Sequence, residues 1–250
     1  MMSAQLIVGI HAVRAALKHG GQRIEQIWYD AARKDRRLRQ LLDEARALGL
    51  RPEASDRAGL DRLSAGANHQ GVIARGAVPT SLDENGLDDL LAGLTHAPLL
   101  LVLDGVTDPH NLGACLRSAD GAGVDAVIAP RDRAGGLTPV ACKVASGAAE
   151  TVPFVQVTNL ARTLRHLQQA HRVFVVGTSD AADSGLFEAA LDGPLAIVMG
   201  AEGEGMRRLT RETCDQLVSL PMAGQVESLN VSVATGICLY EAVRQRGRGG

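Results

Sequence analysis

Several features that define other classes of protein are missing from this chain of 250 residues. No apolar run approaches the roughly 20 residues that a membrane-spanning helix needs. Residues 1–9 show no basic region followed by an apolar segment, so we expect no secretory signal. The chain is 46% hydrophobic, which is enough to bury a sizeable core in one or two domains. These features favour a cytoplasmic protein over a membrane or secreted one.

Patterns that bind metals or form disulfide frameworks are also absent. Cysteine occurs four times, at positions far apart and without a Cys-x-x-Cys pair, namely Cys115, Cys142, Cys214 and Cys238. This spacing favours reduced thiols and argues against a zinc site. The seven histidines form no His-x-x-x-His or Glu-x-x-His pattern. We therefore expect no metal in the functional site.

The net charge of -2 hides two halves of opposite sign. Residues 1–78 hold 13 Lys and Arg against 8 Asp and Glu, a balance of +5, and residues 79–250 hold 13 against 20, a balance of -7. Five of the positive charges fall within seven residues, at Arg33, Lys34, Arg36, Arg37 and Arg39. This density suits contact with RNA phosphates, although a solvated helix face has the same pattern.

Residues 1–78 are expected to form a small α/β domain that binds RNA. Apolar periodicity predicts strands at 6–9, 24–29 and 71–78, helices at 11–19 and 36–48, and a further helical turn around Leu60 and Leu63. Asn68 to Gly71 is a polar turn that suits an RNA contact or, more simply, a plain loop. Residues 79–97 contain proline, glycine and acidic residues and are predicted to be a linker, partly helical.

Residues 98–250 alternate between strand-like and helix-like patterns, which predicts a mostly parallel sheet with helices on both faces. Strands are expected at 99–103, 124–129, 152–157, 172–176, 195–199 and 216–220. Helices are expected from about Asn111, at 160–170 and at 231–240. The last helix has no charged residue and should be buried along most of its length.

Polar side chains cluster where these strands end. Three glycines in the segment 200–205 permit unusual backbone angles and leave room for a ligand beside the main chain, with Glu202 among them. Ser228 and Asn230 precede the last helix, where they could cap it or face a ligand. Asn111 and Arg117 lie about 120° apart on their predicted helix, so they would flank a ligand, unless one is a cap and the other a surface charge.

Three motifs in this region resemble, in order and at compatible spacing, those of the SpoU (TrmH-like) RNA ribose methyltransferases. They read NLGACLRSA from Asn111, MGAEGEGM from Met199, and LPMAG from Leu220 followed by SLNVSVATG from Ser228. The resemblance implies S-adenosylmethionine as the methyl donor and the ribose 2'-hydroxyl of a guanosine in the P loop of 23S rRNA as the acceptor. It also implies a homodimer, a C-terminal SPOUT methyltransferase domain with a trefoil knot, and an N-terminal ribosomal-protein-like RNA-binding domain.

The resemblance also assigns roles to individual residues. The catalytic group would comprise Asn111, Arg117, Glu202, Ser228 and Asn230. Donor contacts would come from Gly200, Leu220 and Leu229. Methyl transfer is an in-line displacement, so these residues mainly have to align the two reactants.

Two other interpretations remain open at this stage. The chain could be a non-catalytic RNA-binding or ribosome-assembly protein on the same fold, or a 2'-O-methyltransferase acting on another rRNA or tRNA site. A nucleotide-binding oxidoreductase fits less well, because residues 200–205 spell G-x-x-G-x-G rather than the dinucleotide fingerprint.

Overall fold

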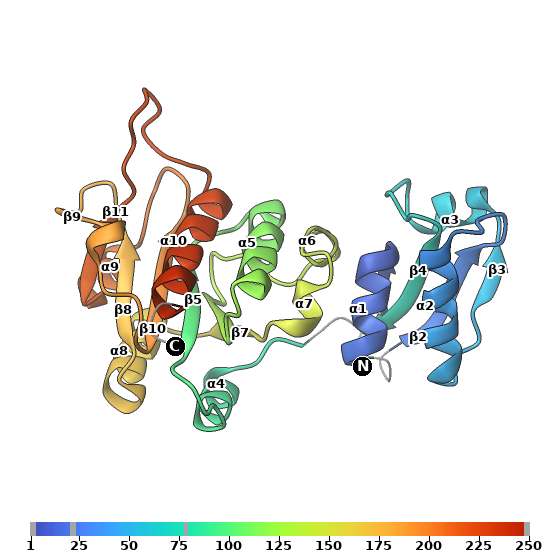
Figure 1. Ribbon diagram of the computed structural model, residues 1–250, viewed down its shortest axis with the longest axis horizontal. Coiled ribbons are helices and arrows are strands. Elements are labelled where there is room, and N and C mark those ends of the chain that lie inside the picture. Colours follow the sequence, from blue (N-terminus) through green and yellow to red (C-terminus); the bar gives the residue numbers. More distant parts are fainter. Residues whose placement is uncertain (1–3, 21–23, 78–79, 248–250) are drawn as a thin grey trace. The chain divides into compact units, whose positions relative to one another are not determined.

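The computed structural model describes residues 4–20, 24–77 and 80–247, and the chain forms two compact units (Figure 1). The first unit combines Met1–Thr80 with Leu137–Thr151, and the second combines Ser81–Gly136 with Val152–Gly250. The predicted boundary between Val78 and Pro79 lies outside the described residues. The functional domains 1–78, 79–97 and 98–250 therefore stay a prediction.

A four-stranded sheet with the order β1-β4-β2-β3 organises the first unit. Strands β1 and β2 run antiparallel to β4, and β3 runs parallel to β2. The short strand β3 was not predicted, because only three residues form it. The elements are β1 (Ala4–Val8), α1 (Ile10–Gly20), β2 (Ile24–Asp30), α2 (Arg36–Ala47), β3 (Glu53–Ser55), α3 (Arg57–Leu63), β4 (Val72–Ala77), α6 (Pro139–Val144) and α7 (Ala148–Thr151).

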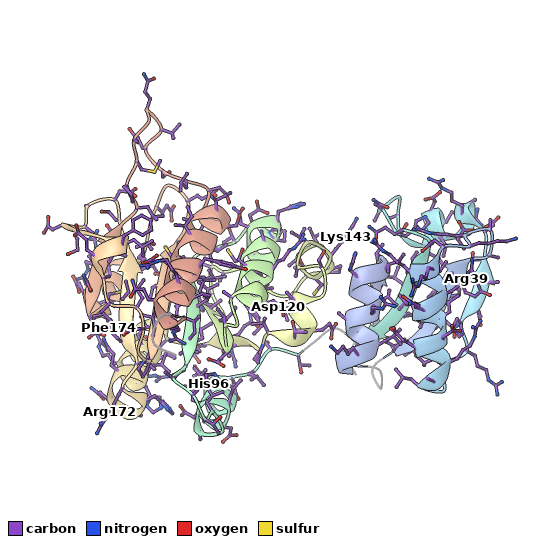
Figure 2. All side chains as sticks on the ribbon, in the orientation of Figure 1. Arg39, His96, Asp120, Lys143, Arg172 and Phe174 are labelled. Atoms are coloured by element: carbon purple, nitrogen blue, oxygen red, sulfur yellow. The ribbon has the colours of Figure 1, made fainter. Side chains whose placement is uncertain are left out.

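Helix α2 separates an apolar stripe from the basic cluster. Asp35 caps it by accepting hydrogen bonds from the N–H groups of Arg37 and Leu38. Its stripe packs into the core of the first unit and consists of Leu38, Leu41, Leu42 and Ala45. The five basic residues between 33 and 39 are all exposed, and Figure 2 labels Arg39 among them. The predicted amphipathic helix is thus present, with its charges available to a partner.

A seven-stranded sheet with the order β7-β6-β5-β10-β8-β11-β9 organises the second unit, and every strand pairing in it is parallel. This confirms the predicted parallel sheet, whereas the two-residue strand β9 was not predicted. The trefoil knot stays a prediction. The elements are α4 (Glu84–Ala92), β5 (Leu99–Asp104), α5 (Pro109–Gly121), β6 (Ala126–Pro130), β7 (Phe154–Val157), α8 (Leu160–His171), β8 (Phe174–Thr178), β9 (Ser184–Gly185), the 3-10 helix η2 (Leu186–Glu188), β10 (Leu195–Gly200), α9 (Arg208–Thr213), β11 (Gln216–Ser219) and α10 (Val231–Arg246).

Helices cover both faces of this sheet. Alternate residues of β5 point in opposite directions, and all of them are buried. Leu100 and Val102 share a core with α4 and α8, while α10 packs against β10 and α5. The predicted linker 79–97 contains α4, whose Leu87 and Leu91 are buried in that core. Among the described residues, no helix is long and apolar enough to cross a membrane.

One side of α10 is more exposed than the sequence predicted. Val233 and Tyr240 are 52% and 53% exposed, and Ile237 between them is half-buried. These three positions lie on one face of the helix because their spacing is four and three residues. The Tyr240 hydroxyl donates a hydrogen bond of 3.3 Å to the carbonyl of Gly121 in α5. The expectation of a helix buried along most of its length is therefore wrong for this apolar face.

Candidate functional site

Residues 200–206 form a tight glycine loop at the end of β10. A Cβ atom on Gly200 would lie 2.3 Å from the carbonyl carbon of Gly205 and from the nitrogen of Met206, so only glycine fits there. Ala201 and Gly205 exchange backbone hydrogen bonds of 3.1 and 2.9 Å, and Gly203 and Gly205 have φ angles of +78° and +68°. The missing side chain at Gly200 thus makes room for the loop itself, and the expectation that these glycines also leave room for a ligand stays a prediction.

Glu202 and Asn111 both bond to the amide side chain of Asn230 at the start of α10. Nδ2 of Asn230 donates to Oδ1 of Asn111 at 2.9 Å and to Oε1 of Glu202 at 2.6 Å. The same Glu202 oxygen accepts from the N–H of Val231 at 3.0 Å. Asn230 also caps α10, because its Oδ1 accepts from the N–H of Ser232 at 3.0 Å. Three of the five predicted catalytic residues therefore share one hydrogen-bonded group, and Asn230 both caps the helix and joins that group.

Asn111 reaches this group from the first turn of α5. The helix begins at Pro109, and Asp108 caps it by accepting from the N–H of His110 at 2.8 Å. The alternative that Asn111 is a helix cap is therefore wrong. Because a capping residue already precedes the helix, the Asn111 amide is left to bond with Asn230 from α10.

The structure does not join the other two predicted catalytic residues to this group. Arg117 lies on α5, is exposed, and its side chain forms no hydrogen bond or ion pair with any residue that the structure describes. Ser228 is exposed in the segment between β11 and α10, which extends away from the sheet (Figure 1). Both side chains are therefore accessible to a ligand.

A cavity of about 400 Å³ lies beside the glycine loop. The ends of β8, β10 and β11, which are neighbours in the sheet, and the start of α10 form its walls. All three predicted donor-binding residues line it, and so do two of the predicted catalytic residues: Gly200, Leu220, Leu229, Glu202 and Ser228. This position at the carboxyl ends of parallel strands is where open α/β sheets bind ligands.

Negative charge predominates around the cavity. Four carboxylates line it, from Asp180, Glu202, Glu204 and Glu227, against one guanidinium, from Arg211. Met222 and the two leucines of the cavity add apolar surface. Such a cavity favours a ligand that combines an apolar part with positive charge.

One wall of the cavity was missed by the sequence analysis. Thr178, the last residue of β8, lines the cavity together with the three residues that follow it, Ser179, Asp180 and Ala181. The predicted strand 172–176 was not extended to its polar end, although parallel strands end at the same edge of a sheet. Following each predicted strand to the polar residues after it would have found this wall.

An ion pair with a buried carboxylate anchors Arg207, the residue that follows the glycine loop. Asp104 is 1% exposed at the end of β5, and its Oδ2 accepts from the N–H of Arg207 at 2.8 Å. Its Oδ1 lies 3.3 Å from Nε of Arg207, and Nη2 of Arg207 donates to the carbonyl of Asp132 at 3.1 Å. Since 103 residues separate the partners of this pair, no local pattern predicted it.

The four cysteines are free thiols. Burial raises the pKa of Cys115 and Cys142 to about 11 and that of Cys214 and Cys238 to about 12. They therefore remain protonated at neutral pH and are poor nucleophiles. The expectation of reduced thiols agrees with this arrangement.

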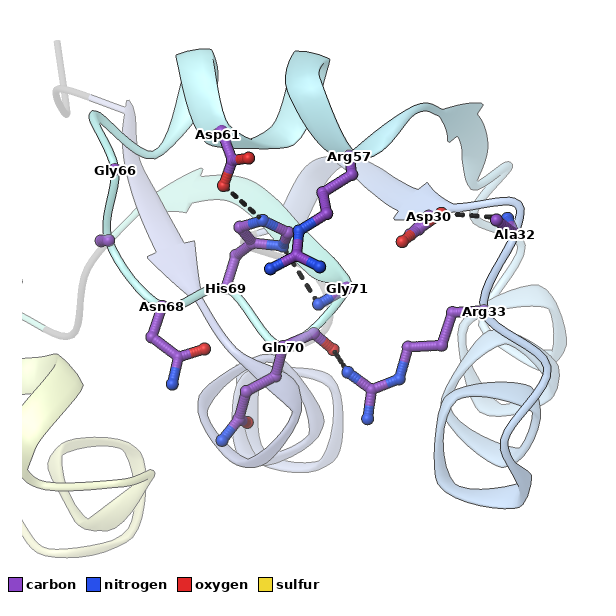
Figure 3. A pocket seen from close by; sticks show the side chains of 11 residues that line it. Asp30, Ala32, Arg33, Arg57, Asp61, Gly66, Asn68, His69, Gln70 and Gly71 are labelled. Carbon is purple, nitrogen blue, oxygen red and sulfur yellow. Dashed lines mark hydrogen bonds and ion pairs between the residues drawn. The ribbon is translucent and has the colours of Figure 1, made fainter.

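The first unit contains a second polar pocket, of about 490 Å³ (Figure 3). His69 is buried in its wall, with Nδ1 accepting from the N–H of Gly71 at 3.0 Å and Nε2 lying 3.0 Å from Oδ1 of Asp61. Because Nδ1 accepts, the ring proton lies on Nε2 and is donated to Asp61. This histidine thus holds the turn from Asn68 to Gly71 in place. The sequence alone allowed two interpretations of that turn, a plain loop or a contact with RNA.

Two arginines also line this pocket. Arg33 donates from Nη1 to the carbonyl of Gln70 at 2.5 Å. Arg57, the first residue of α3, is exposed and pairs with no carboxylate among the described residues. The Gln70 side chain accepts from the N–H of Ile10 at 3.2 Å, which ties the turn to α1. The two guanidinium groups beside this polar turn are suitable contacts for RNA phosphates, although Asp30 and Asp61 also line the pocket.

Two family models match the chain. Residues 98–240 match the SpoU rRNA Methylase family, and residues 6–80 match the family described as RNA 2'-O ribose methyltransferase substrate binding. Together they cover both units and all the motifs identified in the sequence.

Individual relatives match over almost the whole chain. The 23S rRNA (guanosine-2'-O-)-methyltransferase RlmB of Ralstonia nicotianae is 59% identical over 246 residues, which are 98% of this chain and 98% of the relative. The protein of the same name from Haemophilus influenzae is 59% identical and covers 98% of this chain and 99% of its own. The SpoU methyltransferase AviRb of Streptomyces viridochromogenes, solved with AdoMet, superposes with a TM-score of 0.80 at 26% identity, over 98% of this chain and 92% of its own.

Proposed function

The chain belongs to the SpoU rRNA methylase family, and we propose that it methylates the ribose 2'-hydroxyl of a guanosine in 23S rRNA with S-adenosylmethionine as donor. The observation that carries this proposal is the hydrogen-bonded group of Asn111, Glu202 and Asn230 beside the acidic cavity. Relatives that are 59% identical over 98% and 99% of their length carry this activity in their names. An enzyme that modifies 23S rRNA works where ribosomes are built, in the cytoplasm.

The cavity fits the donor in size and chemistry. Its volume of about 400 Å³ falls within the range of roughly 300–1,000 Å³ that cofactor sites occupy. When bound, S-adenosylmethionine supplies an electrophilic methyl group on a positively charged sulfur. Leu220 and Leu229 offer apolar surface to adenine, and Gly200 offers its backbone. The carboxylates of the cavity, Glu202 among them, complement the positive charge.

The proposed role of Arg117 is to hold the RNA. It lies six residues after Asn111 on α5, which corresponds to about 9 Å along the helix axis. Its guanidinium is always charged and binds phosphate in a bidentate manner, so we assign it to the phosphate beside the target ribose. Ser228 completes the catalytic group from the exposed segment before α10.

The first unit is proposed to recruit the RNA. Its basic cluster at residues 33–39 is exposed, and Arg33 and Arg57 border the pocket of Figure 3. Phosphate contacts of this kind give affinity without reading sequence, so they position the substrate and leave the chemistry to the second unit. The P loop of 23S rRNA is the proposed target of the modification.

A homodimer is proposed as the active form. The apolar face of α10, made by Val233, Ile237 and Tyr240, is a contiguous hydrophobic surface on an otherwise packed helix. Exposed apolar faces of this kind mark sites of protein association. A second copy of the chain packed on this face would bury the side chains of Val233 and Tyr240, which are each about half exposed.

The test is methyl transfer by the purified protein onto unmodified 23S rRNA, followed by mass spectrometry of the nucleosides. We expect 2'-O-methylguanosine to form, and Glu202→Gln to slow a single turnover because the neutral amide loses the charge that orients Asn230. Glu212→Gln, a surface control on α9, should match the wild type. A methyl group found on a base, or no transfer by a protein that binds the donor, would refute the proposal.

A further inference from the structure

Three side chains that commonly bind metals meet between α4 and α8 in the second unit. Nε2 of His166 lies 2.9 Å from Oδ1 and 3.0 Å from Oδ2 of Asp88. Nε2 of His171 lies 3.0 Å from the same Oδ1. The three ligand atoms lie within 4.8 Å of one another, and no other group of three His, Cys, Asp or Glu residues in the described parts of the chain meets this criterion.

We propose that Asp88, His166 and His171 form a binding site for a divalent transition metal ion, with zinc as the best match. Imidazole nitrogen and carboxylate oxygen are preferred zinc ligands, at about 2.0–2.2 Å from the ion. Two ligand atoms at such distances lie about 2.9 Å apart at a right angle and about 3.3 Å apart at a tetrahedral angle. The separations of 2.9 and 3.0 Å between each imidazole nitrogen and Oδ1 are therefore already close to those of a coordination sphere.

The surroundings also suit a cation. The three side chains are 22–48% exposed, so an ion can enter and water can complete its coordination. His171 is the last residue of α8, where the helix carries partial negative charge on its free carbonyl groups. The edge-to-face arrangement of the two imidazole rings, with centroids 5.6 Å apart, directs both Nε2 atoms to the carboxylate without stacking the rings.

The site is separate from the methyl-transfer site. His171 precedes β8, whereas the donor cavity follows the opposite end of that strand. An ion here would join α4 to α8, two helices that already share the core of the second unit through Leu87 and Leu164. The ion would thus act as a clip that stabilises this unit and would take no part in the reaction.

The test uses the full chain, with any polyhistidine tag removed, and zinc and cobalt as probes. Calorimetry should show saturable binding of about one zinc ion per chain, and cobalt should give a visible absorption band that zinc removes. The thermal unfolding midpoint should rise with zinc and return on addition of a chelator, because a ligand that binds only the folded state stabilises it.

Variants distinguish a metal site from a hydrogen-bonded cluster. His166→Gln and Asp88→Asn should weaken zinc binding by roughly tenfold or more. Replacing even a residue that only supports a metal ligand typically lowers metal affinity by about 10–100-fold. His96→Gln is the matched control: the exposed His96, labelled in Figure 2, lies 2.8 Å from Asp125 in a pair without a second histidine. The control should bind like the wild type. Absence of saturable binding, or equal binding by all variants, would overturn the proposal.

Discussion

Replacing Asp104 by Asn should loosen the donor cavity by releasing the residue that follows the glycine loop. Asp104 accepts the backbone N–H of Arg207 at 2.8 Å and faces its guanidinium at 3.3 Å. An Asn side chain can keep the first contact, but it removes the charge and turns an amide towards the guanidinium. The loop that carries Glu202 then keeps one hydrogen bond to the sheet but loses the ionic contact that supports it.

The magnitude follows from the burial of the pair. Breaking a fully buried ion pair costs about 3–5 kcal/mol, because the remaining charge is left without a partner. Here the Asp104 side chain is 0% exposed, whereas that of Arg207 is 41% exposed and can be hydrated. The expected loss is therefore about 1.5–3 kcal/mol, in the range that a buried polar group without a partner costs, because the Asn amide would face the guanidinium with a donor. At about 2–4 °C per kcal/mol for domains of this size, the unfolding midpoint should fall by roughly 3–12 °C.

Differential scanning calorimetry of Asp104→Asn measures this loss, and donor titration measures its effect on the cavity. Glu212→Gln is the control, because Glu212 pairs with Arg208 at 2.9 Å with side chains 52% and 72% exposed. Such a surface pair contributes at most about 1 kcal/mol, so the control should unfold within a few degrees of the wild type. Equal midpoints for Asp104→Asn and the control, or unchanged donor affinity in Asp104→Asn, would show that the pair does not support the cavity.

Three further predictions concern the RNA, the domains and the dimer. Arg117→Ala should abolish methylation while the donor dissociation constant stays within about twofold, since the residue lies outside the cavity; calorimetry showing a steep loss of donor affinity would contradict this. A fragment starting at Ser81, which keeps α4 in its core, should bind donor but lose much of the salt dependence of RNA binding. In a plot of log affinity against log salt concentration, each phosphate contact contributes a slope of about 0.7–0.9. Equal affinities of fragment and full chain at every salt concentration would refute recruitment by the first unit. Val233→Glu combined with Tyr240→Glu should give monomers in light scattering, because two charges would be buried at the interface, and an intact dimer would place the interface elsewhere.

Local patterns were sufficient to predict most of the second unit. The apolar run before Gly200 is bounded by proline and glycine, and it forms the central strand β10, which begins at the predicted Leu195 and ends one residue later than predicted. The strand after it and the helix from Val231 were found in the same way. Residue types that favour one backbone conformation therefore located the elements, and the motifs located the cavity between them.

Interactions between distant segments could not be predicted in this way. The pair of Asp104 and Arg207 and the cluster of Asp88 with two histidines each join residues from separate elements, so no spacing pattern reports them. The exposed face of α10 was missed for a related reason. Apolar residues on every side of a helix predict burial, but they do not tell whether the same chain or a second copy provides it.

The central claim is tested most directly by mapping ribose methylation in 23S rRNA from a bacterial strain that lacks the gene for this protein. The proposed function predicts that one 2'-O-methylguanosine, in the P loop, is lost. Expression of the wild-type chain should restore it, and expression of Arg117→Ala should not. An unchanged methylation pattern in the strain lacking the gene would contradict the assignment of both the reaction and its target.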